Sequence, residues 1–555
     1  MAKLNDVQRI LGCKLNELTP ASFGRLVERL LWHLGFEDVS NIDGTGDGGA
    51  DIVATRGVDR WVCQCKWKRS GNVDVDAVEE LRRGLQIYDG SRGSVITTTG
   101  FTARAKERVE NLSSHTNLKL GLWGSPELHS LAADHNTLDR FSTPELRPYQ
   151  ADAFQAARHD LKKNRAAFLV LATGLGKTVI AGTVIDWFLS ENPGAKVLVL
   201  AHTRDLVSQL ERALWRHLSA AVPTQQIHKD ERPENLVGVT VATIQSAVSY
   251  VRSGLRPDFI FIDEAHHSGE AGLFAEVLGL CPEAYRLGAT ATPWRGDEFD
   301  ISRFFGEPTY KIGIEDGMRL GYLVDVRYRL FVDNIDWDVV AALSEQNYSV
   351  KELNHKLFMP QRDERIRDEL LTAWQETRQP RAIVFCQTIE HAERMVAILR
   401  RVPQWRNASA LHNQMLRRDQ TTVLTKFRLG DIPLLVAVDV LNEGVDVPDV
   451  NIVCFARVTH SRRIFIQQLG RGLRLSEGKT HVTVLDFVSD IRRVAAAINL
   501  RKQVSGEAEE LLLPSAHSIT FNDSKAQSLM EEWLKDAASL ETAADEAKLN
   551  FPPIP

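Results

Sequence analysis

The sequence predicts an α/β protein of several domains with a tail at its carboxyl end. The chain is 555 residues long, and two series of short apolar runs alternate with helical stretches after a smaller mixed series. Continuous apolar runs suit parallel strands that are buried on both faces of a sheet. We therefore expect domains at 1–135, 140–325 and 376–504, a helical connecting segment at 326–375 and an acidic helical tail at 505–555.

The first region reads as a small α/β unit. An apolar stripe with helical spacing runs through 21–36, and a second helical stretch lies near 75–88. Strand-like runs occupy 51–55, 61–68 and 94–99. Helices and strands mixed in this way form a two-layer or three-layer α/β core.

Two further regions have a different pattern, in which short apolar strands alternate with helices. Such alternation indicates crossover connections and parallel sheets. The strands are expected at 166–173, 196–202, 239–244, 259–265 and 285–291 in the first region, and at 381–388, 434–440, 451–457 and 481–487 in the second.

The net charge does not exclude nucleic-acid binding, because the charge is unevenly distributed along the chain. Residues 505–555 hold three Lys/Arg against ten Asp/Glu, a net of −7, so the other 504 residues carry +1 of the chain's −6. A near-neutral body can still carry local basic grooves. The six cysteines lack zinc-ligand spacing. They indicate reduced thiols, and with no signal segment or long apolar span we expect a cytoplasmic protein.

A phosphate-binding loop is predicted at 172–178, ATGLGKT, between an apolar strand and a helix. Glycines let backbone N–H groups approach phosphates, the lysine reaches the terminal phosphates, and the threonine can hold Mg²⁺. The general phosphate-loop pattern has glycine six positions before the lysine, where this sequence has Leu171. The expected nucleotide ligands are Thr173, Gly174, Leu175, Gly176, Lys177 and Thr178.

The sequence DEAH at 263–266 follows a buried strand, at the edge where open α/β sheets bind ligands. Asp263 suits Mg²⁺, and Glu264 suits orienting the attacking water. Alone, this sequence could be a surface helix start, but the upstream loop favours an ATP site.

Residues 145–490 resemble a superfamily 2 helicase of the DEAD/DEAH type, similar to type I and type III restriction motors. The motifs follow in family order: RPYQ (147–150), AHTRDLVSQ (201–209), VATIQSA (241–247), GATATP (288–293), VAVDVLNEGVDVPDV (436–450) and QQLGRGLR (467–474). The resemblance implies two RecA-like domains, with Gln150 at the adenine and Gly444 and Asp446 coupling the cleft to the strand. It also implies a backbone-directed nucleic-acid contact through Thr203, Arg204, Thr243 and Gln245, and a γ-phosphate contact through Arg471, the favoured finger, and Arg474.

The stretch 44–68 places an acid at the start of one strand and Gln-x-Lys on the next. Side chains two apart on a strand share a face, so Gln64 and Lys66 project together beside Asp51. Nuclease sites of the PD-(D/E)XK type place two acids and a lysine in this way. Gln64 supplies a neutral oxygen in place of the usual acid. Glu28, on the preceding helix, is a candidate accessory acid, and Asp47 in the turn is a weaker candidate.

Residues 20–120 resemble the Mrr family of restriction endonucleases through FGRLVERLLWHLGF, TGDGGADIVA, WVCQCKWK and VITTTGFTARAKE. The resemblance implies a restriction-endonuclease-like fold with Asp51, Gln64, Lys66 and Glu28 as catalytic residues, and with Mg²⁺ held by Asp51 and Gln64. Taken singly, Lys66 could be a solvated strand lysine and the glycines a simple turn.

Together these features predict an ATP-dependent DNA helicase or translocase fused to an Mg²⁺-dependent endonuclease that acts in restriction or anti-phage defence. The cofactors are ATP and Mg²⁺, and the partner is duplex or single-stranded DNA. A homodimer or partner defence subunits would be needed to cut both strands at once. The alternatives are a motor whose first domain binds DNA without cutting, an RNA helicase, or a structural subunit with an ATPase switch.

Overall fold

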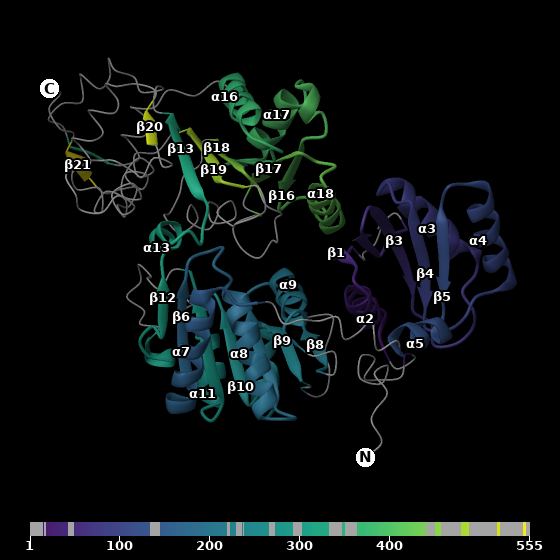
Figure 1. The fold of residues 1–555 in the computed structure, drawn as a ribbon, viewed down its shortest axis with the longest axis horizontal. Coiled ribbons are helices and arrows are strands. Elements are labelled where there is room, and N and C mark those ends of the chain that lie inside the picture. Colours follow the sequence, from purple (N-terminus) through teal and green to yellow (C-terminus); the bar gives the residue numbers. More distant parts are fainter. Residues whose placement is uncertain are drawn as a thin grey trace. The chain divides into compact units, whose positions relative to one another are not determined.

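The computed structural model describes two compact units of the chain (Figure 1). The first comprises Met1–Val170, Gly176–Lys311 and Leu416–Leu429, and the second Leu171–Leu175, Ile312–Met415 and Gly430–Pro555. The residues described within them are 15, 18–42, 49–133, 145–218, 222–228, 236, 238–265, 272–291, 302–331, 347–349, 363–438, 440, 450–456, 479–487, 519–521 and 548–550.

The first sheet is mixed and has the order β1-β2-β3-β4-β5. Its first two neighbouring pairs are antiparallel and its last two are parallel. The elements are α2 (Pro20–His33), β1 (Glu37–Asn41), β2 (Ile52–Arg56), β3 (Asp59–Lys66), α3 (Val75–Ile87), β4 (Arg92–Thr97), α4 (Ala103–His115), β5 (Lys119–Trp123) and α5 (Ser125–Ala133).

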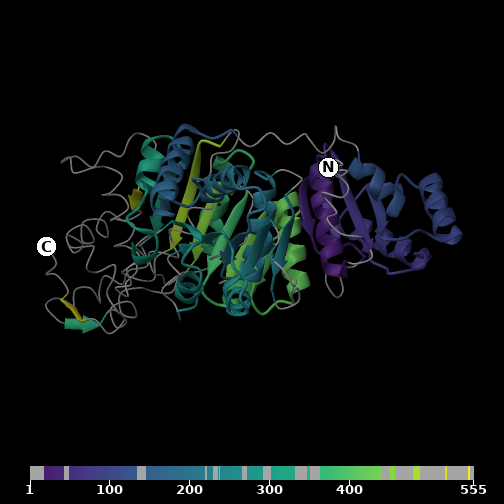
Figure 2. The ribbon, with the colours of Figure 1, turned by 90° about the horizontal axis from the view of Figure 1, so that it is seen from below.

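Helices cover both faces of this sheet. On β3, Cys63 packs in one cluster with α2 and α5, whereas Val62 packs in another with α3 and α4. Figures 1 and 2 show α2 on one side of the strands and α4 on the other. The alternation of β3 therefore fixes which residues face α2 and which face α3.

The second sheet has the order β12-β6-β11-β10-β7-β9-β8. From β6 to β8 its neighbouring strands are parallel. Its elements are α7 (Pro148–Asn164), β6 (Ala166–Leu171), α8 (Lys177–Glu191), β7 (Val197–Ala201), α9 (Arg204–Trp215), β8 (Thr224–Ile227), β9 (Val239–Thr243), α10 (Ile244–Arg252), β10 (Phe259–Asp263), α11 (Leu273–Leu280), β11 (Tyr285–Thr290), α12 (Ser302–Phe305) and β12 (Tyr310–Ile312).

The third sheet has the order β16-β17-β15-β18-β19-β13-β20, and its neighbouring strands are parallel. Its central strands are buried along their whole length, as continuous apolar runs require. The elements from here on are α13 (Ile314–Arg319), β13 (Asp325–Phe331), β14 (Asn347–Ser349), α16 (Asp363–Glu376), β15 (Ala382–Cys386), α17 (Ile389–Leu399), the 3₁₀ turn η3 (Pro403–Trp405), β16 (Ser409–His412), α18 (Arg417–Leu429), β17 (Leu434–Val438), β18 (Ile452–Ala456), β19 (His481–Phe487), β20 (Ile519–Phe521) and β21 (Lys548–Asn550).

The fold class predicted from the sequence is confirmed, but two helical expectations differ from the structure. The segment 326–375 begins with the strand β13, which pairs along its length with β19, whereas its last part, α16, is helical as expected. Its charged residues favoured a helix, yet Val326 is buried beside the exposed Arg327, as on a strand. In the tail, the described residues form β20 and β21, and the rest of that prediction lies outside the described residues.

Candidate functional site

The predicted nuclease residues Asp51, Gln64 and Lys66 come from two neighbouring strands. Asp51 directly precedes β2, and its backbone N–H donates to the carbonyl oxygen of Cys63 at 2.9 Å. Its carboxylate Oδ2 accepts from Gln64 Nε2 at 2.7 Å and from the Cys65 backbone N–H at 2.5 Å. Asp51 is 5% exposed and Gln64 is 2% exposed. The structure therefore brings this acid and this amide into direct contact in a buried position.

The remaining oxygen of Gln64 is suited to a cation. Because Asp51 accepts from Nε2, the amide is oriented with Oε1 away from that carboxylate oxygen. Among the described residues, Oε1 is buried and has no hydrogen-bond partner. Burying such a group is unfavourable unless a ligand satisfies it. Oxygen is the donor that Mg²⁺ prefers, so Asp51 and Gln64 fit the predicted metal.

Lys66 contacts an acid that the sequence did not single out. Its Nζ lies 2.5 Å from Oε2 of Glu80 on α3, and the two side chains are 33% and 30% exposed. Glu80 lies one turn before Gly84, and glycine is uncommon inside a helix. This glycine was the signal in the sequence that another backbone segment could pack closely against α3 near Glu80.

The glycine-rich turn before Asp51 is explained by the approach of α3. Gly49 has a φ of +92°, and a Cβ there would lie 1.9 Å from the carbonyl oxygen of Glu80. A Cβ on Gly84 would lie 2.7 Å from the carbonyl oxygen of Gly49. Only glycine fits at both positions, so the turn and α3 are in backbone contact. Asp47 lies outside the described residues.

Glu28 does not join this group. It lies on α2, which covers the face of β3 that carries Cys63, whereas Gln64 and Lys66 project from the face that carries Val62. Its ion-pair partner is Arg212 of α9. Burial raises the pKa of Glu28, and the charge of Arg212 opposes that shift. Helical spacing could not show which face of the sheet α2 would cover.

Within the first compact unit, side chains of α2 contact α9 and the segment that follows it. The buried Arg29 donates to the Val222 carbonyl oxygen at 2.9 Å. Arg25 pairs with Glu211 at 3.6 Å. The rings of Trp32 and Trp215 lie 6.4 Å apart. Buried charges of this kind are found where each has a partner, as here.

The predicted phosphate loop connects β6 to α8. Gly174 and Gly176 have φ values of +94° and +78°, which glycine adopts without strain. Lys177 begins α8 and Thr178 follows it, so the loop ends at a helix N-terminus, where backbone N–H groups favour an anion. Leu175 is fully buried, and Thr173 lies in the loop between. The strand, turn and helix context expected from ATGLGKT is present.

The acids of DEAH lie at the carboxyl end of β10. Lys177 Nζ is 3.4 Å from Glu264 Oε1, and both side chains are largely buried. Glu264 has a φ of +50°, a strained conformation for a side chain of this size that costs on the order of 1–2 kcal/mol. Such strain persists where the surroundings fix it, often at functional sites.

Asp263 fits the predicted metal at this site. Its Oδ1 is buried and has no hydrogen-bond partner among the described residues. Burial raises the pKa of Asp263, with Glu264 acting in the same direction and Lys177 opposing it. A divalent cation would satisfy the oxygen and favour the ionised form.

Gln150 lies against the phosphate loop. It is 6% exposed, and its Oε1 accepts from the Arg147 backbone N–H at 3.0 Å. A Cβ on Gly176 would lie 2.6 Å from Gln150 Nε2, so the amide is pressed against the loop backbone. The predicted adenine-side glutamine is therefore beside the loop, held by its own helix start.

The four predicted nucleic-acid residues meet at one edge of the second sheet. β7 and β9 are parallel neighbours, with Ala201 opposite Thr243. Thr203 follows β7, caps α9 through the Leu206 N–H at 3.3 Å, and precedes Arg204. Gln245 is exposed one residue into α10. The predicted residues Gly444, Asp446, Arg471 and Arg474 lie outside the described residues.

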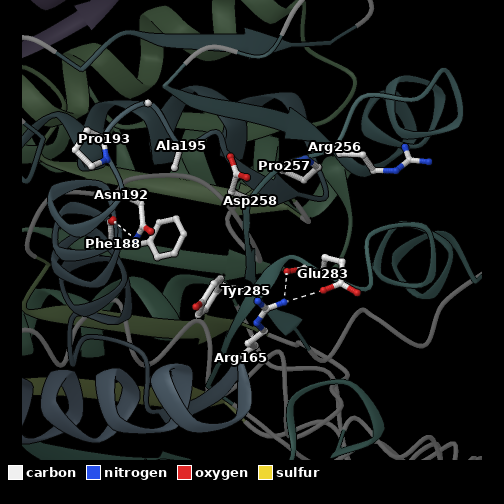
Figure 3. Close-up of a pocket in the computed structure, with 11 residues that line it drawn as sticks. Arg165, Phe188, Asn192, Pro193, Ala195, Arg256, Pro257, Asp258, Glu283 and Tyr285 are labelled. Carbon is white, nitrogen blue, oxygen red and sulfur yellow. Dashed lines mark hydrogen bonds and ion pairs between the residues drawn. The ribbon is translucent and has the colours of Figure 1, made fainter.

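A separate open hollow of about 630 Å³ lies at the opposite edge of this sheet (Figure 3). Asp258 and Tyr285 mark it at the amino ends of β10 and β11. Figure 3 shows Arg165 pointing to Glu283, with an ion pair of 2.8 Å. The phosphate loop lies at the carboxyl end of β6, so this hollow is not the nucleotide site.

Comparison with protein families supports the division into nuclease-type and helicase-type parts. Residues 15–132 match the family described as "Restriction endonuclease", and residues 143–295 match "Type III restriction enzyme, res subunit". Residues 341–476 match "Helicase conserved C-terminal domain". The chain thus combines a restriction-endonuclease-like domain with a helicase-type motor, and the resemblance predicted from the motifs is confirmed.

The similar proteins include one named as a helicase and one named as a restriction endonuclease subunit. The chain is 28% identical over 379 residues to a Schizosaccharomyces pombe protein named as a mitochondrial ATP-dependent helicase, irc3, covering 66% of this chain and 61% of that protein. It is 24% identical over 487 residues to the "Type I restriction enzyme EcoKI endonuclease subunit" of Escherichia coli, covering 74% of this chain and 41% of the subunit. The chain therefore spans less than two thirds of either relative.

A solved structure shares the fold over most of the chain. The "ATP-dependent Type ISP restriction-modification enzyme LlaBIII bound to DNA" matches with a TM-score of 0.51 and 18% identity. The match covers 95% of this chain and 42% of that enzyme. In the described part of this chain, no helix is both long and apolar enough to cross a membrane.

Proposed function

We propose that the protein is an ATP-driven DNA translocase that carries an Mg²⁺-dependent endonuclease. The observation that carries the nuclease half is the buried Asp51–Gln64 contact with an oxygen of Gln64 left for a cation. The motor half is supported by Lys177 and Glu264, which meet at the end of a phosphate loop.

In the motor, residues of the first parallel-sheet domain bind and orient the nucleotide. The backbone of 173–177 and the Lys177 ammonium hold the phosphates, and Glu264 orients the attacking water. Thr178 and Asp263 would hold Mg²⁺, which when bound neutralises phosphate charge. By the resemblance, Arg471 and Arg474 add positive charge at the γ-phosphate, which ties hydrolysis to domain closure.

In the nuclease domain, Asp51 and Gln64 would hold Mg²⁺, which when bound stabilises negative charge on the scissile phosphate. Lys66 holds the attacking water or a phosphate oxygen. The water gives a proton to solvent as its oxygen bonds to phosphorus, one phosphorus–oxygen ester bond breaks, and the leaving oxygen takes up a proton from solvent. With a single carboxylate from Asp51, this site binds Mg²⁺ more weakly than a two-acid site.

Contacts through Thr203, Arg204, Thr243 and Gln245 would address the nucleic-acid backbone, so movement would not depend on sequence. A role in restriction or defence is supported by the similarity to a type I restriction subunit. One chain offers one nuclease site, so we propose that two copies or a partner subunit act together in a double-strand break.

The first test is incubation of the protein with unmodified and modified plasmid, Mg²⁺, and ATP or none. Wild type should nick or cut the plasmid, and Asp51→Ala should lower the rate at least a hundredfold while ATP hydrolysis persists. Unchanged nicking by Asp51→Ala would remove Asp51 as a metal ligand. DNA binding without cutting by wild type would favour a clamp, and ATPase stimulation by RNA alone would favour an RNA helicase.

A further inference from the structure

Glu80 forms an ion pair with Lys66, one of the proposed nuclease residues. The ammonium of Lys66 lies 2.5 Å from Glu80 Oε2, on the face of β3 that also carries Gln64. A lysine side chain has four rotatable bonds and fixes its charge poorly by itself. One fixed carboxylate at this distance restricts where that charge can lie.

The position of Glu80 is itself fixed by backbone packing. Its carbonyl group lies so close to Gly49 that no Cβ fits there, and Gly84 one turn later meets the same turn. The buried residues Val78 and Leu81 anchor α3 on the sheet on either side of Glu80. The acid is therefore carried by a helix that cannot shift without moving the turn that leads into Asp51.

The neighbouring acid Glu79 points to different partners. Its carboxylate accepts from Arg82 Nε at 2.8 Å and from Arg108 Nε at 2.6 Å. Two consecutive acids on α3 therefore have different roles, one between helices and one at the nuclease strand. Glu79 provides a matched control for any change made at Glu80.

We propose that Glu80 is a positioning residue for Lys66, an inference that rests on the proposed nuclease function. An ion pair that is about one third exposed contributes little to stability, so its role lies in the geometry of the site. Outer-shell partners of this kind typically change activity by about 10–100-fold. Glu80 does not itself contact the reacting atoms.

The test compares Glu80→Gln with Glu79→Gln in the full-length protein, by plasmid nicking with Mg²⁺. Glu80→Gln should lower the nicking rate about 10–100-fold, with DNA binding and melting temperature unchanged, whereas Glu79→Gln should keep wild-type nicking. In a Lys66→Ala background, Glu80→Gln should lower the rate no further, because its effect passes through Lys66.

A second readout does not require cleavage. Acylation of lysines followed by peptide mass spectrometry should show Lys66 labelled faster in Glu80→Gln than in wild type or Glu79→Gln. Wild-type nicking by Glu80→Gln, an additive effect with Lys66→Ala, or unchanged Lys66 labelling would each overturn the proposal. Absence of nicking by wild type would instead overturn the proposed nuclease function, and the labelling would still decide whether the pair exists.

Discussion

The proposed nuclease site and the proposed ATP site each contain a lysine paired with a glutamate, but the two pairs are built differently. Lys177 and Glu264 are 3.4 Å apart and mostly buried. Both belong to motifs that can be recognised in the sequence, the phosphate loop and DEAH. Lys66 and Glu80 are closer, yet about one third exposed, and Glu80 comes from a helix without a motif. The Lys177–Glu264 pair could be predicted from the sequence, because a glycine-rich loop and a strand end contain its residues. The Lys66–Glu80 pair is seen only in the packing of α3 against β3.

The largest expected effect breaks the ATP-site pair. Lys177→Ala removes the charge that holds the phosphates and should lower ATP hydrolysis by about 10³-fold or more. A steady-state ATPase assay with DNA present measures it, and a thermal melt confirms folding.

Lys66→Ala is the matched control, because it should leave ATP hydrolysis intact while the nicking rate falls to a low but measurable value. If Lys177→Ala retains more than a tenth of wild-type turnover, Lys177 does not hold the phosphates. The proposal that Lys177 serves ATP hydrolysis and Lys66 serves nicking would then be wrong.

A smaller effect is expected from supplying the nuclease site with a second acid. Gln64→Glu replaces a donor with a carboxylate at a buried contact with Asp51, and two such groups cannot both ionise easily. Without Mg²⁺ we expect a loss of about 1–3 kcal/mol in the free energy of unfolding. Mg²⁺ should restore stability, and nicking should reach half its maximum at a lower Mg²⁺ concentration.

Urea unfolding with and without Mg²⁺ measures the stability change, with KCl at equal ionic strength as the control. A variant that is equally stable with and without Mg²⁺, and that needs the same Mg²⁺ for nicking, would show that no cation binds between these two residues.

The smallest effect is expected at Glu28. Because Glu28 lies on the α2 side of the sheet, Glu28→Gln should change nicking by less than about threefold, a free-energy change below 1 kcal/mol. Its raised pKa means that the folded protein holds the proton more tightly than the unfolded chain. This stabilisation is full below pH 4.5 and is lost as the pH rises through the folded pKa.

Glu28→Gln stays neutral, so its stability relative to wild type should increase as the pH rises over that window. Urea unfolding at a series of pH values measures this difference. A large loss of nicking would instead restore Glu28 as an accessory acid of the nuclease site.

Much of the fold could be predicted because local pattern decides it. The apolar runs that became β6, β7 and β10 are buried in a parallel sheet, and the loop between β6 and α8 has the expected context. Alternation on β3 correctly placed Gln64 and Lys66 on one face.

The remaining features depend on long-range packing. Alternation cannot show which helix covers which face, so the sequence did not reveal that α2, which carries Glu28, lies on the face opposite Gln64, or that Glu80 contacts Lys66. The segment 326–375 was expected to be helical, but pairing with β19 makes its start a strand. Tertiary contacts routinely override such local preferences.

Helix α9 has a consequence for how force could pass through the molecule. It begins directly after Thr203, where a nucleic-acid strand is expected, and its last turn carries Arg212 and Trp215 against α2. Twelve residues make a rod about 18 Å long. Because α9 is one continuous helix, a displacement of its first residues, beside the proposed strand contact, would also displace the contact with α2 at its last turn.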